Sequence, residues 1–216
     1  MVRSLSAGVL SALAQRRLVA RDFLWLIARN RSTGAPVPDG YWSDVGTITV
    51  SVIDPETGSS VSRQFFGAGA LISISDISLV SNIAVQNVTI TMSQVADRVN
   101  DIVRTYDCKQ ATVQIFRGLF DPDTRLIVAP APCRFVGFVD TIDITTPSEG
   151  EIGSVVFTCA SHTQEMTRGN SDTRSDASQK LRSATDNFFE DAAIVGEWEM
   201  RWGTKYGPLQ TKQRKG

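Results

Sequence analysis

The chain has a single histidine, His162, so any nucleophile–histidine site would have to use it. The nearest candidate nucleophile is Cys159, which we expect to lie in a strand. Because side chains alternate between the two faces of a strand, an extended backbone would point Cys159 and His162 to opposite faces. A lone histidine at a strand end is more often a surface or hydrogen-bonded residue than a catalytic base. The pair therefore does not indicate nucleophilic catalysis.

The cysteines do not indicate a metal site either. A structural zinc uses four protein ligands, and a catalytic zinc uses three and a water. Cys108, Cys133 and Cys159 are widely spaced, form no CxxC pair and are accompanied by one histidine. We therefore expect no metal and no other cofactor. An odd number of dispersed cysteines predicts free thiols in a reducing compartment, with at least two of them buried as small hydrophobes.

Paired carboxylates could support glycosidase chemistry. The candidate pairs are Asp140 with Asp143, Glu149 with Glu151, and Asp121 with Asp123. The last two pairs lie in predicted turns, where acidic residues are favoured because they bond the local backbone. Asp140 shares strand parity with Val136 and Phe138, so we expect an inward carboxylate that pairs with a structural arginine. A wall-degrading hydrolase that uses Asp140 and Asp143 is the enzymatic alternative to a chain without catalytic function.

The glycine-rich stretch Gly67-Ala-Gly69-Ala-Leu does not match the dinucleotide-binding pattern, because no third glycine or helix follows where one is needed. A bend between strands explains it better. With no nucleophile, metal or phosphate site indicated, we expect that the chain is not an enzyme.

Two helices are expected. Leu5, Val9 and Leu13 recur every four residues, which predicts a short amphipathic helix over residues 4–17. Apolar residues at helical spacing predict a second helix over residues 94–104, with Ser93 as its N-cap.

Strands account for most of residues 44–160. The apolar run at 22–28 predicts a strand buried on both faces. Alternating residues predict a hairpin with its turn at Asp54–Gly58, a strand at 88–92, strands on both sides of the turn at Asp121–Thr124, and a hairpin formed by 135–144 and 152–159. The Pro130-Ala-Pro132 step belongs at a sheet edge or at the start of a strand. Residues 32–43 have loop composition, with Tyr41 and Trp42 either packed on the core or offered to a neighbour.

The order strands, helix, strands predicts an α+β, mainly β domain over residues 1–160. Residues 161–216 are expected to form an extended assembly arm. The net charge of −1 gives no global attraction to nucleic acid, and we expect the local basic clusters to be solvated surface. No stretch approaches 18 apolar residues, so no insertion into a membrane is expected.

The arm begins with a polar stretch at 161–187 that has few apolar groups to bury. Large aromatic residues then return. The expected anchors of an assembly interface are Phe188, Phe189, Trp198 and Trp202 in the arm, with Tyr41 and Trp42 in the body. Aromatic groups that follow a polar linker are typical of docking on a partner or back on the body.

Short segments along the chain resemble a known family. They are Leu5-Ser-Ala-Gly8, Ile83-Ala-Val-Gln-Asn-Val-Thr-Ile-Thr, Ala111-Thr-Val-Gln-Ile-Phe-Arg-Gly118, Phe135-Val-Gly-Phe-Val-Asp-Thr-Ile, and the arm pieces Ser175-Asp-Ala-Ser-Gln-Lys, Thr185-Asp-Asn-Phe-Phe189 and Trp202-Gly203. In this order they resemble the tail-tip or baseplate hub proteins of long-tailed, siphovirus-like bacteriophages and gene transfer agents. The match is made of short, degenerate pieces, and the arm is its most distinctive part.

The resemblance implies a split β-barrel of the tail-tube type with a flanking helix, whose copies pair strands into a ring around the tail channel. It implies a trimer, or alternatively a hexamer, placed between the distal tail protein and the central fibre protein. The expected location is the tail tip of a virion assembled in the host bacterial cytoplasm. The chain lacks the cysteine-rich domain of some hubs, so an iron–sulfur site is not carried over. The alternatives are the distal tail protein itself and a receptor- or carbohydrate-binding tail module that uses Tyr41 and Trp42.

Overall fold

The computed structural model of the chain describes residues 6–67, 69–78, 84–149, 153–167, 169 and 172–197. It divides into two compact units, Met1–Thr167 and Arg168–Gly216, which we call the body and the arm. The division falls later than residue 160 because the 3-10 helix η1 (His162–Thr167) continues directly from the last strand. The His162 ring packs against the Phe138 ring, with 5.1 Å between their centroids.

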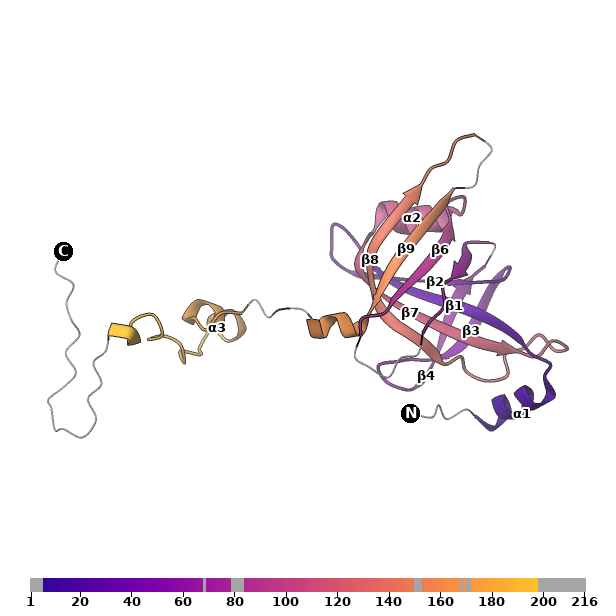
Figure 1. Cartoon of the computed structure of the whole chain (residues 1–216), viewed down its shortest axis with the longest axis horizontal. Coiled ribbons are helices and arrows are strands. Elements are labelled where there is room, and N and C mark those ends of the chain that lie inside the picture. The colour runs from indigo at the N-terminus through magenta and orange to yellow at the C-terminus, as the bar shows by residue number, and fades with distance from the viewer. Residues whose placement is uncertain are drawn as a thin grey trace. The chain divides into compact units, whose positions relative to one another are not determined.

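The body is mainly β, as expected, and its strands form one curled nine-stranded sheet in the order β3-β4-β2-β1-β7-β8-β9-β6-β5 (Figure 1). The strands are β1 (Val19–Arg29), β2 (Pro36–Trp42), β3 (Thr47–Ile53), β4 (Ser60–Phe66), β5 (Leu71–Ile74), β6 (Asn87–Ser93), β7 (Asp107–Phe120), β8 (Cys133–Thr145) and β9 (Ser154–Ser161). All neighbouring strands pair antiparallel except β2 and β4, which meet in parallel at Tyr41 and Phe66.

The antiparallel pair β1–β7 lies at the centre of the sheet and is buried on both faces. Phe23 is opposite Phe116 and Leu24 is opposite Ile115. These four side chains are all at most 2% exposed. Because successive residues point to opposite faces, each strand contributes to two separate cores. This confirms that the apolar run at 22–28 is a strand buried on both sides.

The larger core lies on the face of β1–β7 that carries Leu24 and Ile115. It also contains apolar residues of β5, β6, β8 and β9, and is covered by the helix α2 (Asp97–Thr105), which buries Val99 and Ile102. The smaller core lies on the opposite face. It consists of Phe23, Trp42, Val50, Val52, Phe65, Phe116, Phe120 and Ala131.

The sheet closes around the smaller core through one residue of the β7–β8 connection. Ala131 forms a parallel bridge with Val52 of β3, and its N–H donates to the Ser51 carbonyl at 2.9 Å. Its carbonyl accepts from the Ile53 N–H, also at 2.9 Å. Cys133, two residues later, pairs with β7. The segment between Pro130 and Cys133 thus joins the outer edge of β3 to β7, as expected for a proline-flanked start of a strand.

A largely buried arginine, Arg63, packs beside this smaller core, with its side chain 13% exposed. Arg63 donates to the Gln114 amide oxygen at 2.6 Å and to the Asp54 carboxylate at 3.1 Å. Its guanidinium also lies 4.8 Å from the centroid of the Trp25 ring. Gln114 is only 2% exposed, so without Arg63 its carbonyl would lose a partner in a site that water does not reach. The turn at Asp54–Gly58 is therefore tied to the centre of the sheet.

Residues 32–43 do not form the expected loop, because Pro36–Trp42 is strand β2 and pairs with β1 along its full length. Pro36 and Pro38 are compatible with this because β2 has a continuous partner on one edge only. A Cβ on Gly40 would lie 2.4 Å from the Gln64 carbonyl oxygen, so glycine is needed where β4 approaches. The prolines and glycine that suggested a loop belong to a strand that pairs continuously with β1 on one side and meets β4 closely at one point on the other.

Helix α2 is present as expected, but it starts later and its N-cap is Ala96 rather than Ser93. The Ser93 hydroxyl accepts from the Val95 N–H instead, which holds a turn before the helix. The outer face carries Arg98, whose guanidinium lies 3.6 Å from the centroid of the Phe66 ring and donates to Asp39 at 2.6 Å. These contacts fix α2 to β2 and β4.

The expected inward position of Asp140 is wrong. On β8 the buried residues are Phe135, Gly137 and Val139, so the opposite parity faces the core and Asp140 is exposed. A β-bulge between Val139 and Thr141 then shifts the register. Asp140 therefore needs no buried arginine. Among the described residues, the least exposed ion pair of the body is Arg63–Asp54 instead.

Two further helices lie outside the sheet. Helix α1 (Ala7–Gln15) falls within the expected range 4–17, and the Ser6 hydroxyl accepts from the Val9 N–H at its start. In the arm, α3 (Asp176–Arg182) is capped by Ser175 and carries an ion pair between Lys180 and Asp176. None of its residues is buried. A short 3-10 helix, η2 (Val195–Glu197), ends the described part of the arm. No helix in the described ranges is long and apolar enough to cross a membrane.

We expect Arg63→Met to lower the free energy of unfolding by about 3 kcal/mol, because it leaves Asp54 and Gln114 without their buried partner. Urea unfolding followed by circular dichroism measures the change. Arg17→Met is the matched control, since Arg17 pairs with Asp123 in an ion pair that is 65% exposed on both sides and should change stability by less than about 1 kcal/mol. Equal effects of the two substitutions would contradict the central role of Arg63.

Candidate interaction site

The expected interface anchors occupy different environments. Phe188 is 81% exposed in the arm, and its ring meets the half-buried Phe189 edge-on at 5.0 Å. Tyr41 and Trp42 are 0% and 8% exposed, so of the two alternatives these rings pack on the core of their own chain. Trp198 and Trp202 lie outside the described residues.

Tyr41 and Trp42 are adjacent in β2 and therefore enter different cores. The Tyr41 hydroxyl lies in the larger core and donates to Asp39 at 2.8 Å. Burial, together with the negative charge of Asp39, raises the pKa of Tyr41 well above its ordinary value. Trp42 lies in the smaller core, where its ring stacks on Phe23 at 5.9 Å.

One edge of the Trp42 ring borders a pocket of about 480 Å³ beside the smaller core. We call it the Trp42 pocket. It is lined by Val19, Arg21, Trp42, Asp44, Val45, Ile48, Phe120, Asp121, Pro122 and Arg125. The lining residues come from β1, from the segment that runs from the end of β2 into β3, and from the end of β7 with the turn that follows it. The closure of the sheet brings these three segments together. The sequence predicted Trp42 as an anchor and a turn at Asp121–Thr124, but not this site, because its residues lie in three separate segments of the chain.

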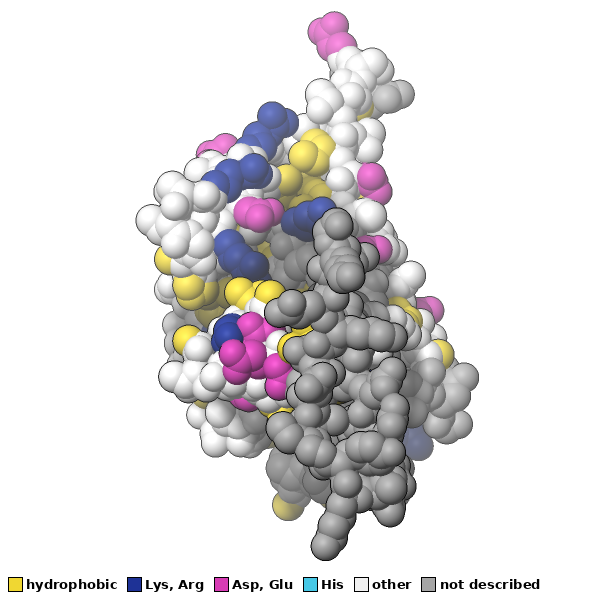
Figure 2. Space-filling view, turned by 90° about the vertical axis from the view of Figure 1, so that its left-hand side faces the viewer, with side chains coloured by type: hydrophobic (Ala, Val, Ile, Leu, Met, Phe, Trp, Pro, Cys, Tyr) yellow, Lys and Arg dark blue, Asp and Glu magenta, His cyan; other side chains and the backbone are white. Residues whose placement is uncertain are grey.

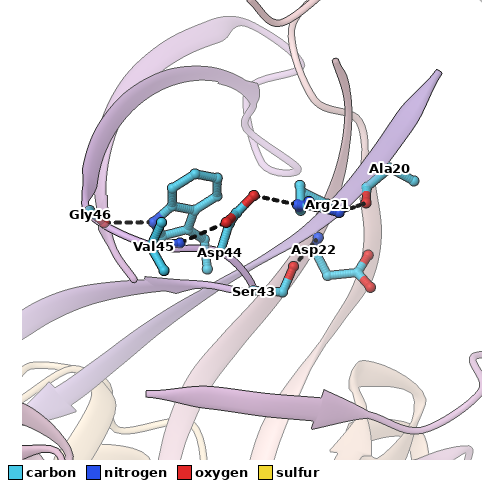
Figure 3. A network of polar contacts seen from close by, with 8 residues as sticks. Ala20, Arg21, Asp22, Ser43, Asp44, Val45 and Gly46 are labelled. Carbon is cyan, nitrogen blue, oxygen red and sulfur yellow. Dashed lines mark hydrogen bonds and ion pairs between the residues drawn. The ribbon is translucent and has the colours of Figure 1, made fainter. Parts of the chain in front are cut away.

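A polar network holds the β2–β3 connection on one side of the pocket (Figure 3). Arg21 Nε donates to Asp44 Oδ2 at 2.6 Å, and the Val45 N–H donates to the other carboxylate oxygen at 2.9 Å. Trp42 Nε1 donates to the Gly46 carbonyl at 2.8 Å. These bonds turn the Val45 side chain outward, where it is 75% exposed. The hydrogen bond from Arg21 is the main reason that the pKa of Asp44 is lowered.

The opposite side of the pocket is the turn after β7. Asp121 accepts from the Asp123 N–H at 3.1 Å and from the Thr124 hydroxyl at 2.8 Å, so its carboxylate is used within the turn. Arg125 follows in a left-handed conformation, with φ of 56°. Arg125 lines the pocket, and its positive charge adds a small contribution to the lowered pKa of Asp44. The pocket therefore combines apolar walls with a rim of charged groups.

Elsewhere on the body, arginines and aspartates form surface pairs. Asp22 accepts two hydrogen bonds from Arg117, at 2.7 and 3.1 Å, beside a smaller hollow of about 260 Å³ next to β5. The hydrogen bonds to Asp22 raise the pKa of Arg117. On the face shown in Figure 2, basic and acidic side chains lie near one another with hydrophobic side chains between them. The mixed charge agrees with the net charge of −1.

The residues considered for catalysis are not brought together. Cys159 is buried in the larger core, and His162 is exposed on η1. Within the described ranges, no group of three or more histidine, cysteine or acidic residues could hold a metal ion. None of the three cysteines forms a disulfide, and two of them, Cys108 and Cys159, are buried, as expected. Burial raises the pKa of Cys108 to about 11 and that of Cys159 to about 12.

Comparison with known proteins adds no family: no protein-family model matches the sequence, and no curated protein matches it.

We expect only Cys133 to react with a thiol reagent such as Ellman's reagent in the folded chain at pH 8, because Cys108 and Cys159 are protonated and shielded there. All three thiols should react after unfolding in urea. The Cys133→Ser variant should show no fast reaction when folded. Rapid labelling of a second thiol in the native chain would contradict the packing of the larger core.

A second prediction concerns Asp44 and pH. Its pKa is lower in the folded chain than the ordinary 3.8, so its contribution to stability is present above that value and is lost as the pH falls below it. Asp44→Asn should therefore lower the urea midpoint more at pH 7 than at pH 3. Arg21→Gln, which removes the main cause of the shift, should flatten the pH dependence in the same way. A variant that loses as much stability at pH 3 as at pH 7 would exclude this role.

Proposed function

We propose that the chain is a structural subunit of a phage tail tip or baseplate hub, which forms a ring around the tail channel between the distal tail protein and the central fibre. The proposal rests on the resemblance of the sequence segments quoted above, and its finer fold assignment is a split barrel of the tail-tube type. The chain works by binding copies of itself and neighbouring tail proteins, without a catalytic role.

The observation that carries the proposal is the arm. It contains large apolar side chains that its own short helices do not cover: Leu181 is 89% exposed and Phe188 is 81% exposed. Burying such a side chain contributes about 1.5–3 kcal/mol, and exposed aromatic groups of this kind dominate many protein interfaces. A neighbouring subunit that covers them would order the arm and stabilise the assembly.

The body supports the same function through its strand edges. The outer edge of β3 is bonded to Ala131 of the same chain, whereas β5, among the described residues, pairs with β6 alone. A strand edge without a partner is a template for pairing with another chain unless it is blunted. Half of the β5 residues are exposed, so β5 is the edge that we expect a ring-forming neighbour to extend.

The alternative functions can be distinguished by the number of copies in the assembly and by the exposure of Tyr41 and Trp42. A distal tail protein uses a similar barrel in a hexamer, whereas the hub is expected as a trimer, so the number of copies distinguishes the two. A carbohydrate- or receptor-binding module would need Tyr41 and Trp42 as an exposed platform. Since both rings are buried, the structural role is the better supported of these.

The arm provides the test. In cells that produce the particle, Phe188→Ala and Phe189→Ala should each weaken incorporation of the chain into tails, with a loss of affinity of about 30-fold for about 2 kcal/mol of lost burial. The readouts are the amount of the chain in purified tails and the number of complete particles. Trp202→Ala is expected to act in the same way.

Val95→Ala is the control, because it truncates an apolar side chain that is 82% exposed on the body. All variants should keep the circular dichroism spectrum and melting temperature of the unmodified chain. Normal assembly by both phenylalanine variants would contradict the role of the arm, and loss of the folded monomer would show that the arm belongs to its own core. Absence of the unmodified chain from tails would contradict the proposed function itself.

A further inference from the structure

We infer that the Trp42 pocket receives the Phe188–Phe189 segment from the arm of a second copy of the chain. This inference rests on the proposed function, because it names the surface on which an arm docks during assembly. Its two components are a preformed pocket in the body and an exposed aromatic pair in the arm.

The pocket has the size and lining of a side-chain socket. Its volume of about 480 Å³ lies in the range of about 300–1,000 Å³ that is usual for binding pockets. Apolar walls are supplied by Trp42, Phe120 and Ile48, while Val45 extends the apolar surface to the exterior. Trp42 is held in place by its hydrogen bond to Gly46 and by the Phe23 ring. A phenylalanine ring that enters would meet aromatic groups that are already fixed. Little entropy would therefore be lost by ordering the side chains of the pocket.

The charges at the rim fit the residues around the two phenylalanines. The segment reads Asp-Asn-Phe-Phe-Glu-Asp over residues 186–191, so carboxylates flank both rings. At the pocket, Asp44 is paired with Arg21, and Asp121 is used by its own turn. The Arg125 N–H donates to the Asp121 carbonyl within the turn, but its guanidinium forms no hydrogen bond with any described residue and is exposed at the rim. Arg125 is thus the cation available to Glu190 or Asp191.

A second copy is the occupant that suits a ring. When a projection on each copy fits a pocket elsewhere on the next copy, the contact is heterologous and repeats from copy to copy. Such contacts close into a ring when the rotation between copies allows it. The same chain carries both surfaces, so no other protein is required for the contact.

Photo-cross-linking tests this directly on the full chain. p-Benzoylphenylalanine at position 188 is activated in an equal mixture of unlabelled and ¹⁵N-labelled chains, at a concentration where assemblies form. We expect cross-linked peptides from residues 42–48 or 119–126, joining a labelled to an unlabelled chain. Cross-links confined to one chain, cross-links to other parts of the body, or none at all would overturn the inference.

Binding measurements test the individual contacts. A fluorescent peptide of residues 184–194 is titrated into the full-length Phe188→Ala chain, whose own arm is thereby weakened as a competitor, and its anisotropy is followed. Added to this chain, Val45→Asp and Arg125→Glu should each weaken binding at least about tenfold. Val95→Asp is the matched control, since it places the same charge at an equally exposed valine outside the pocket. Equal affinities for all three variants, or an equal loss in each, would overturn the inference.

Charge reversal separates a direct contact from a general effect. A peptide with Glu190→Lys or Asp191→Lys should regain affinity for the Arg125→Glu chain but lose it for the chain that retains Arg125. Losses of binding free energy that simply add for the two substitutions would overturn the contact with Arg125.

If the pocket variants bind the peptide normally and the chain still joins tails, the socket is wrong and the proposed function stands. If peptide binding follows the predictions but the chain is absent from tails, the proposed function is wrong instead.

Discussion

The structure depends on the pairing of β1 with β7, two strands that are buried on both faces. Their side chains alternate between the two cores, so Phe23 and Phe116 support one side of the sheet while Leu24 and Ile115 support the other. A strand buried on both faces cannot slip by one residue without exchanging its contributions to the two cores. This fixes the register of the β1–β7 pair. The remaining strands extend the sheet from β1 toward β3 and from β7 toward β5.

The positions of the functional surfaces follow from that centre. Because the sheet on the side of β3 returns through Ala131 to β7, the β2–β3 connection and the turn after β7 meet at the end of the smaller core. Their meeting creates the Trp42 pocket. On the other side, the larger core is covered by α2, and the sheet ends at β5. One half of the body is thus closed by its own chain and carries a pocket. The other half ends at β5, whose outer edge has no strand partner among the described residues.

Much of the fold could be predicted from local patterns, whereas the site could not. The strand at 22–28, the two hairpins and both helices follow from apolar periodicity and turn residues, which act over a few neighbours. The prediction of a loop over residues 32–43 was wrong for Pro36–Trp42. Its prolines and glycine reflect a strand that pairs fully with β1 alone and meets β4 closely at one point, which is a tertiary constraint. Asp140 was predicted to face the core because Val136 and Phe138 were taken as the inward residues of its strand. The buried residues are Phe135 and Val139 of the alternate set, so Asp140 faces outward. The pocket joins three segments that are distant in the sequence, and no local pattern predicts it.

The central claim is that copies of this chain form a closed ring in which the arm of one copy lies on the body of the next. Electron microscopy of the purified assembly, averaged along its axis, measures this most directly. The account predicts a closed ring of three or six copies around a channel, with density from each arm reaching the neighbouring body beside Val45 and Arg125. An assembly that contains a single copy, or an open chain of copies with each arm on its own body, would contradict it.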